Sequence, residues 1–150
     1  MLSFNSPANW FPTTAAATLI PTLYTFGTTA PYFTCSGFAS AGQSIAIEGY
    51  HLSDSLIVTA PAGYAVSATA NGTYTNSLTL GADSLGRLNN VVFIAMDGTA
   101  PATNPAQIAL SSTGATNVLI AVSGTTGGAL TVSHFAKTDP TDCATEDGTI

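Results

Sequence analysis

The sequence predicts an all-β fold, an antiparallel β-sandwich of about seven or eight short strands. Short apolar segments alternate with period two, and turn residues separate them at intervals of roughly 8–14 residues. No segment shows the 3.6-residue period of an amphipathic helix. The pattern is clearest between Gln43 and Ser67, where three strands and two turns follow one another.

Within this central block, residues 45–48 read Ile-Ala-Ile-Glu and alternate as a half-buried strand does. The next strand, Leu56–Thr59, is apolar and β-branched, and Pro-Ala-Gly at 61–63 ends it as a turn. Tyr64 and Val66 then restart the alternation. The chain after this block repeats this arrangement.

Before the block, Leu19–Phe26 is a strand with Pro21 inside it, which favours a position at the edge of a sheet. Residues 27–42 are expected to form a loop. The third strand of the block is expected to extend over Tyr64–Ala70. After it the expected strands are Ser77–Leu80, Val91–Met96, Gln107–Ser111, Asn117–Ser123 and Ala129–Ala136. Turn-rich stretches at 81–90 and 124–128 separate them.

The chain therefore divides into an extended leader (1–18), one sandwich domain (19–125), and a C-terminal strand with a loose acidic tail (126–150). The leader has no helical period, and prolines interrupt it. Its apolar residues suggest that it packs on its own domain or on a neighbouring copy. The leader is a candidate donor segment for a neighbouring copy. The residues that would anchor it there are Leu2, Phe4, Trp10 and Phe11.

Charge excludes several partners. Only 7% of the residues are charged, against roughly 25% in an average globular domain. Arg87 and Lys137 are the only basic residues and the net charge is −6, so neither nucleic acid nor a polybasic membrane contact is expected. No apolar run reaches the length of a membrane span, and no signal peptide is recognisable.

The two cysteines, Cys35 and Cys143, are far apart and do not form a CxxC motif. In an extracellular domain they are candidates for a disulfide, which would close a loop of about 100 residues and stabilise the fold by ~4–5 kcal/mol. The alternative is two separate thiols.

Four motifs follow one another in order: SGFASAGQSIAIEGYHL from Ser36, LIVTAPAGYAVS from Leu56, SLTL from Ser77, and IALSSTGATNVLIAVSGT from Ile108. In these motifs, residues 22–125 resemble an immunoglobulin-like β-sandwich repeat of secreted and cell-surface proteins of Bacteroidetes-type bacteria. The resemblance implies an immunoglobulin-like fold, an extracellular location, and a role as stalk, anchor or adhesin without catalysis. The two Asp-Ser-Leu triplets also resemble O-glycosylation sites of these bacteria, which would be modified at Ser55 and Ser84; the alternative is that the triplets occur by chance.

The strand Val91–Met96 departs from the family pattern, because it is apolar on both faces. If Val91, Phe93 and Ala95 point inward, the outward residues are Val92, Ile94 and Met96. Alternation places two more apolar residues outward, Ile57 and Leu119. Outward apolar residues on a domain with so few charges suggest a contact surface between subunits. The alternative is that the leader or the tail of the same chain covers them.

Residues for chemistry are sparse. His51 and His134 stand alone, without the spacing of a metal site or a catalytic motif, and no cofactor is expected. The acidic residues of the tail could form a calcium site, but a solvent-exposed chain end is the favoured interpretation of that segment. The aromatic residues Trp10, Tyr32, Tyr50 and Tyr74 are candidates for a surface that stacks sugars; the alternative is that they belong to the core or to cross-strand pairs, as most aromatic residues of sandwiches do.

Together these features favour a non-enzymatic structural subunit of an extracellular filament or surface assembly. Identical subunits would associate when a terminal segment of one, the leader or Ala129–Ala136, inserts into the sheet of the next. One alternative is a carbohydrate-binding or adhesive module of a larger bacterial surface protein. Another is a viral decoration protein.

Overall fold

A computed structural model describes residues 18–99 and 106–127. These ranges are all β, without a helix, and confirm the predicted β-sandwich. The strands are β1 (Thr22–Phe26), β2 (Tyr32–Cys35), β3 (Gln43–Tyr50), β4 (Leu56–Thr59), β5 (Tyr64–Ser67), β6 (Ser77–Leu80), β7 (Leu88–Met96), β8 (Ala106–Ser111), β9 (Val118–Val122) and β10 (Gly124–Gly127).

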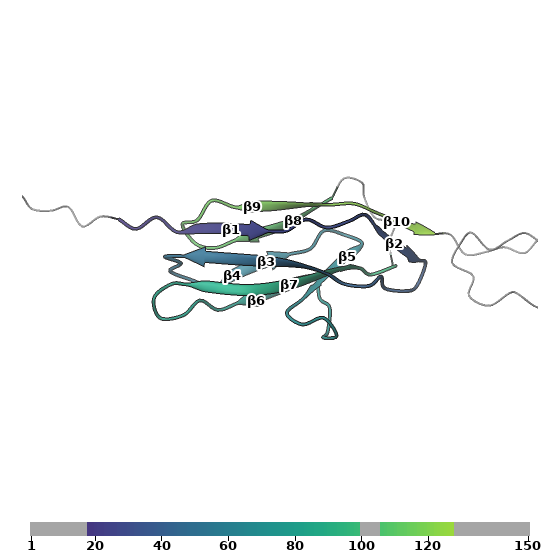
Figure 1. Cartoon of the computed structure of the whole chain (residues 1–150), viewed down its shortest axis with the longest axis horizontal. Coiled ribbons are helices and arrows are strands. Elements are labelled where there is room, and N and C mark those ends of the chain that lie inside the picture. The colour runs from purple at the N-terminus through teal and green to yellow at the C-terminus, as the bar shows by residue number, and fades with distance from the viewer. Residues whose placement is uncertain (1–17, 100–105, 128–150) are drawn as a thin grey trace, which may run out of the picture.

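The strands form two four-stranded antiparallel sheets and one short parallel ladder. The first sheet has the order β1-β3-β7-β5 and the second the order β6-β4-β8-β9. The ladder pairs β10 with β2 in parallel. Figure 1 shows an elongated molecule in which the described chain enters β1 at one end of the long axis and leaves β10 at the other.

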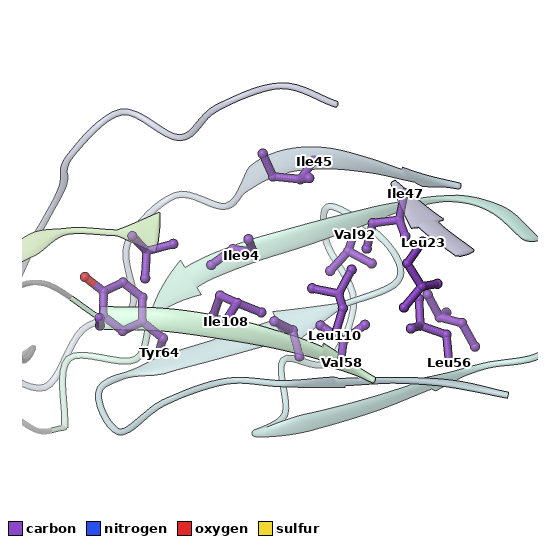
Figure 2. Packing of buried hydrophobic residues seen from close by; sticks show 14 of the residues in the cluster. Leu23, Ile45, Ile47, Leu56, Val58, Tyr64, Val92, Ile94, Ile108 and Leu110 are labelled. Carbon is purple, nitrogen blue, oxygen red and sulfur yellow. The ribbon is translucent and has the colours of Figure 1, made fainter. Parts of the chain in front are cut away.

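The hydrophobic core lies between the two sheets (Figure 2). β3 and β7 contribute inward residues in register, with Ile45 opposite Val92. Val58 and Leu110 face them from the second sheet and are also cross-strand partners. Since these side chains are fully or almost fully buried, the described strands fill the core without a missing strand.

Each lateral side of the sandwich is partly closed by a link between sheets. On one side, Val66 of β5 and Thr75 exchange two backbone hydrogen bonds of 2.8 and 2.9 Å. They belong to the hairpin around Asn71 and Gly72, which links the two sheets because β5 lies in the first sheet and β6 in the second. On the other side, β2 continues from β1 and β10 from β9, and their parallel pairing joins the first and second sheets. These links limit the exposed strand edges.

Several expected boundaries were wrong. The loop predicted at 27–42 contains β2, and the turn predicted at 124–128 contains β10, because parallel pairing orders both segments. Residue 125, where the sandwich domain was expected to end, lies in β10. Strand β1 begins after Pro21 rather than around it, β5 ends at Ser67, and β7 begins at Leu88. The leader up to residue 17 and the expected strand at 129–136 lie outside the described residues.

Candidate functional site

The outer face of the first sheet carries an apolar patch, here called the sheet-one patch. In one row across three strands, Phe26 of β1 pairs with Ala46 of β3, and Ala46 pairs with Val91 of β7. Tyr24 and Phe93 flank this row on the same face, two residues along their strands. Phe26, Val91 and Tyr24 are exposed, and Phe93 is half-buried. Adjoining apolar side chains of this kind are typical of an interaction surface.

This patch corrects the predicted facing of β7. Val92, Ile94 and Met96 were expected to point outward, but all three lie in the core, and Val92 is only 1% exposed. Val91 points outward and is 42% exposed. The sequence Val-Val-Phe-Ile-Ala-Met is apolar at every position, so its alternation does not show which residues face inward. Pairing with β3 decides the phase.

The outer face of the second sheet carries the two other predicted residues. Ile57 of β4 is 44% exposed and Leu119 of β9 is 56% exposed, which confirms that both point outward. They are not cross-strand neighbours: Ile57 pairs with Ser111 of β8, whereas Leu119 pairs with Ala109 of the same strand. They therefore lie diagonally across β8 and form two separate apolar points rather than one cluster.

Strand β9 is also an edge of the second sheet. It pairs with β8 on one side, and within the described ranges no strand pairs with its other side. Its sequence, Val-Leu-Ile-Ala-Val, holds no charge and no proline, the features that commonly protect an edge from further pairing. β9 therefore presents backbone donors and acceptors beside apolar side chains. We call this the β9 edge.

The remaining predicted site residues fall into different places. Cys35, at the end of β2, is disulfide-bonded, and the chain contains one other cysteine, Cys143, which lies outside the described residues. Ser84 is exposed in the loop between β6 and β7, whereas Ser55 is partly buried beside β4. The leader anchors Leu2, Phe4, Trp10 and Phe11 also lie outside the described residues.

The aromatic candidates for sugar stacking are separated by the fold. Tyr32 is buried in the core and cannot serve, Tyr74 is partly buried, and Trp10 lies outside the described residues. Tyr50 is exposed at the end of β3, next to Tyr24 of β1, which the sequence reasoning did not select. The sequence signal for Tyr24 was its place next to Leu23, because adjacent residues of a strand point to opposite faces and Leu23 is the one that is buried.

A carboxylate binds one ring of this aromatic pair. The hydroxyl of Tyr50 donates a 2.8 Å hydrogen bond to Oε2 of Glu48. This hydrogen bond, together with the negative charge of Glu48, raises the pKa of Tyr50. Glu48 is also the cross-strand partner of Tyr24.

The described residues contain no group of three or more His, Cys, Asp or Glu side chains that could hold a metal ion. His51 is exposed and lies in a left-handed turn with a φ of 57°. In the part of the chain that the structure describes, no helix is long and apolar enough to cross a membrane.

Comparison of the chain with protein-family models and with curated proteins finds no match in either set. The arrangement of exposed apolar side chains and strand edges is thus the main guide to what the protein does.

Proposed function

We propose that this protein is a non-enzymatic structural subunit of an extracellular filament or surface assembly, in which identical subunits associate. The observation that carries the proposal is the combination of the sheet-one patch with the β9 edge on a nearly chargeless domain. A strand edge without charge or proline favours further strand pairing, and adjoining exposed apolar side chains favour contact with another protein surface.

The strand order supports an immunoglobulin-like form of the sandwich. In immunoglobulin domains, strands A-B-E-D form one sheet and C-F-G the other. Taking β1, β3, β4, β5, β7, β8 and β9 as A to G gives the sheets β1-β3-β7-β5 and β4-β8-β9, with β6 as an additional strand beside β4. This arrangement is common among modular cell-surface proteins, in keeping with the proposed location.

The leader is the proposed donor segment. It is followed by Leu19 and Ile20, which are exposed before β1 begins. An extended segment of 18 residues can span on the order of 60 Å, enough to reach along a neighbouring domain. Because the described strands already fill the core, the donor would add to a sheet edge rather than complete the interior.

The β9 edge is the proposed acceptor. A donor strand there would satisfy the outward backbone groups of Val118–Val122 and could place its apolar side chains beside Leu119. The donor comes from one subunit and the acceptor from the next, so the contact is head-to-tail and builds an open chain of subunits. The described chain begins and ends at opposite ends of the long axis, a shape that suits such a chain (Figure 1).

Electron microscopy and light scattering of the purified, intact protein test the proposal. We expect regular polymers from the intact chain and none from a variant lacking residues 1–18. Leu119→Lys, which places a charge on the β9 edge, should also abolish polymers, whereas Leu85→Lys, at an exposed loop position, should leave them unchanged. A monodisperse monomer at high concentration would contradict self-association. Unchanged polymers from the deletion would contradict the donor role.

A further inference from the structure

A row of three outward residues crosses the first sheet and shares Tyr24 with the sheet-one patch. Tyr24 of β1 pairs with Glu48 of β3, and Glu48 pairs with Asn89 of β7. Tyr50 lies next to this row, with its ring centroid 6.2 Å from that of Tyr24 and an angle of 69° between the planes. Tyr24 is 50% exposed and Tyr50 is 39% exposed, so two aromatic rings meet as a corner at the surface.

A shallow polar hollow begins at Tyr50 and runs between the end of β3 and the loop from β6 to β7. The polar residues that line it are Asp83, Arg87, Asn89 and Asn90, with small residues such as Gly81 between them. The loop is held in shape because Oδ1 of Asp83 accepts backbone hydrogen bonds from Leu85 (2.9 Å) and Arg87 (2.8 Å). These hydrogen bonds shape the loop that forms one side of the hollow.

The corner and the hollow together offer two kinds of contact. The rings offer apolar faces, and the hollow offers hydrogen-bond donors from amides and a guanidinium together with carboxylate acceptors. Small-molecule sites combine aromatic surface with a few placed polar groups in this way. A pyranose ring has the matching form, with C–H groups on its faces and hydroxyls around its rim.

We propose that the Tyr24–Tyr50 corner and the adjoining hollow bind a neutral oligosaccharide. One sugar ring stacks on the ring of one tyrosine, and the ring of the second tyrosine forms a side wall of the site. Hydroxyls of the next sugar reach Asn89, Asp83 and Arg87. Two carboxylates, from Glu48 and Asp83, against one cation, Arg87, leave the site with a net negative charge that disfavours acidic sugars. The site shares Tyr24 with the sheet-one patch, but a single subunit carries the whole site and binds the glycan without assembly.

The test begins with the full chain on an array of neutral and acidic glycans, followed by calorimetric titration of the best neutral ligand. We expect Tyr24→Ala and Tyr50→Ala each to weaken binding at least tenfold, and Asn89→Ala to weaken it severalfold. Tyr50→Phe keeps the ring but loses the hydrogen bond to Glu48, so it should weaken binding less than Tyr50→Ala does. Phe33→Ala, at an exposed aromatic position on β2, is the matched control and should bind normally.

Three results would overturn the proposal. These are no binding to any neutral glycan, binding that survives both tyrosine substitutions, and binding of acidic glycans alone that is lost in Arg87→Ala. Because the tyrosines are exposed, their variants should fold, and circular dichroism with thermal melting checks this. The variant lacking residues 1–18 should still bind the glycan, so failure of the assembly proposal and failure of this one can be told apart.

Discussion

Tyr32 and Tyr64 pack edge to face in the core, with ring centroids 5.7 Å apart and an angle of 79° between their planes. Tyr32 belongs to the parallel ladder of β2 and β10, and Tyr64 belongs to β5 at the edge of the first sheet. The contact therefore ties the ladder to the sandwich. Figure 2 shows Tyr64 at one end of the row of core side chains.

This pair predicts alkaline unfolding. Burial raises the pKa of Tyr32 and of Tyr64, because the charged phenolate loses solvation. For groups with a raised folded pKa, the stabilisation is complete below the unfolded value of about 10 and is lost as pH rises above it. We expect the urea midpoint to hold up to about pH 9.5 and then fall steeply, together with a rise in tyrosinate absorbance.

The control for alkaline unfolding uses substitutions that remove single hydroxyls. Tyr32→Phe and Tyr64→Phe should each flatten the fall in the urea midpoint above pH 10, whereas Tyr24→Phe, at an exposed position, should not. The hydroxyl of Tyr64 is buried without a hydrogen-bond partner in the described part of the chain, so Tyr64→Phe should also keep or raise stability at pH 7. A loss of more than about 1 kcal/mol at pH 7 would contradict this account.

Neighbouring valines on β7 test the facing of that strand. Val92→Asp buries a charge in the core and should lower the free energy of unfolding by more than about 4 kcal/mol, or prevent folding. Val91→Asp points outward and should change it by less than about 1 kcal/mol. Urea denaturation measures both. A stable Val92→Asp variant would refute the observed facing of β7. If the sheet-one patch is a subunit contact, Val91→Asp should also reduce polymer formation.

Two glycines predict opposite effects of an added methyl group. Gly98 has a φ of 69°, and a Cβ there would overlap the backbone carbonyl of Phe38, so Gly98→Ala should cost at least about 2 kcal/mol. Gly81 has open space around the Cβ position and no positive φ, so Gly81→Ala should be neutral or stabilise by about 0.4–1 kcal/mol. Thermal melting of the two variants separates them, and equal effects would contradict the described turn at Gly98.

The predicted disulfide between Cys35 and Cys143 has a covalent test. Non-reducing peptide mapping should recover one linked peptide pair from the intact monomer. Cys35→Ser and Cys143→Ser should each lower stability by up to ~4–5 kcal/mol, and the double variant should lower it no further. Additive losses from the two single variants, or a linked dimer in place of an internal link, would show that the two cysteines do not pair within one chain.

The sequence was most informative where each strand has one apolar and one polar face. The alternation at Ile45 and Ile47 predicts both the strand and its inward residues, and the structure buries both. Ile57 and Leu119 were placed outward for the same reason. Period-two alternation carries this information because successive side chains of a strand point to opposite faces.

Two features lay beyond that pattern. β10 reads Gly-Thr-Thr-Gly and has no strand periodicity of its own, since its order comes from pairing with the distant β2. The sheet-one patch joins Phe26, Ala46 and Val91, which are far apart along the chain and become neighbours only through the registers of β1 with β3 and β3 with β7.

The sequence by itself determined the all-β class, the position of most strands, and a surface nearly free of charge, because local alternation, turn residues and composition are properties of the chain alone. Only the tertiary structure decided which face of β7 is buried, which strands form the edges, and that Tyr24 meets Tyr50 beside a polar hollow. These features depend on strand pairing between distant segments. An apolar strand such as Val91–Met96 satisfies either facing until a partner strand fixes its register.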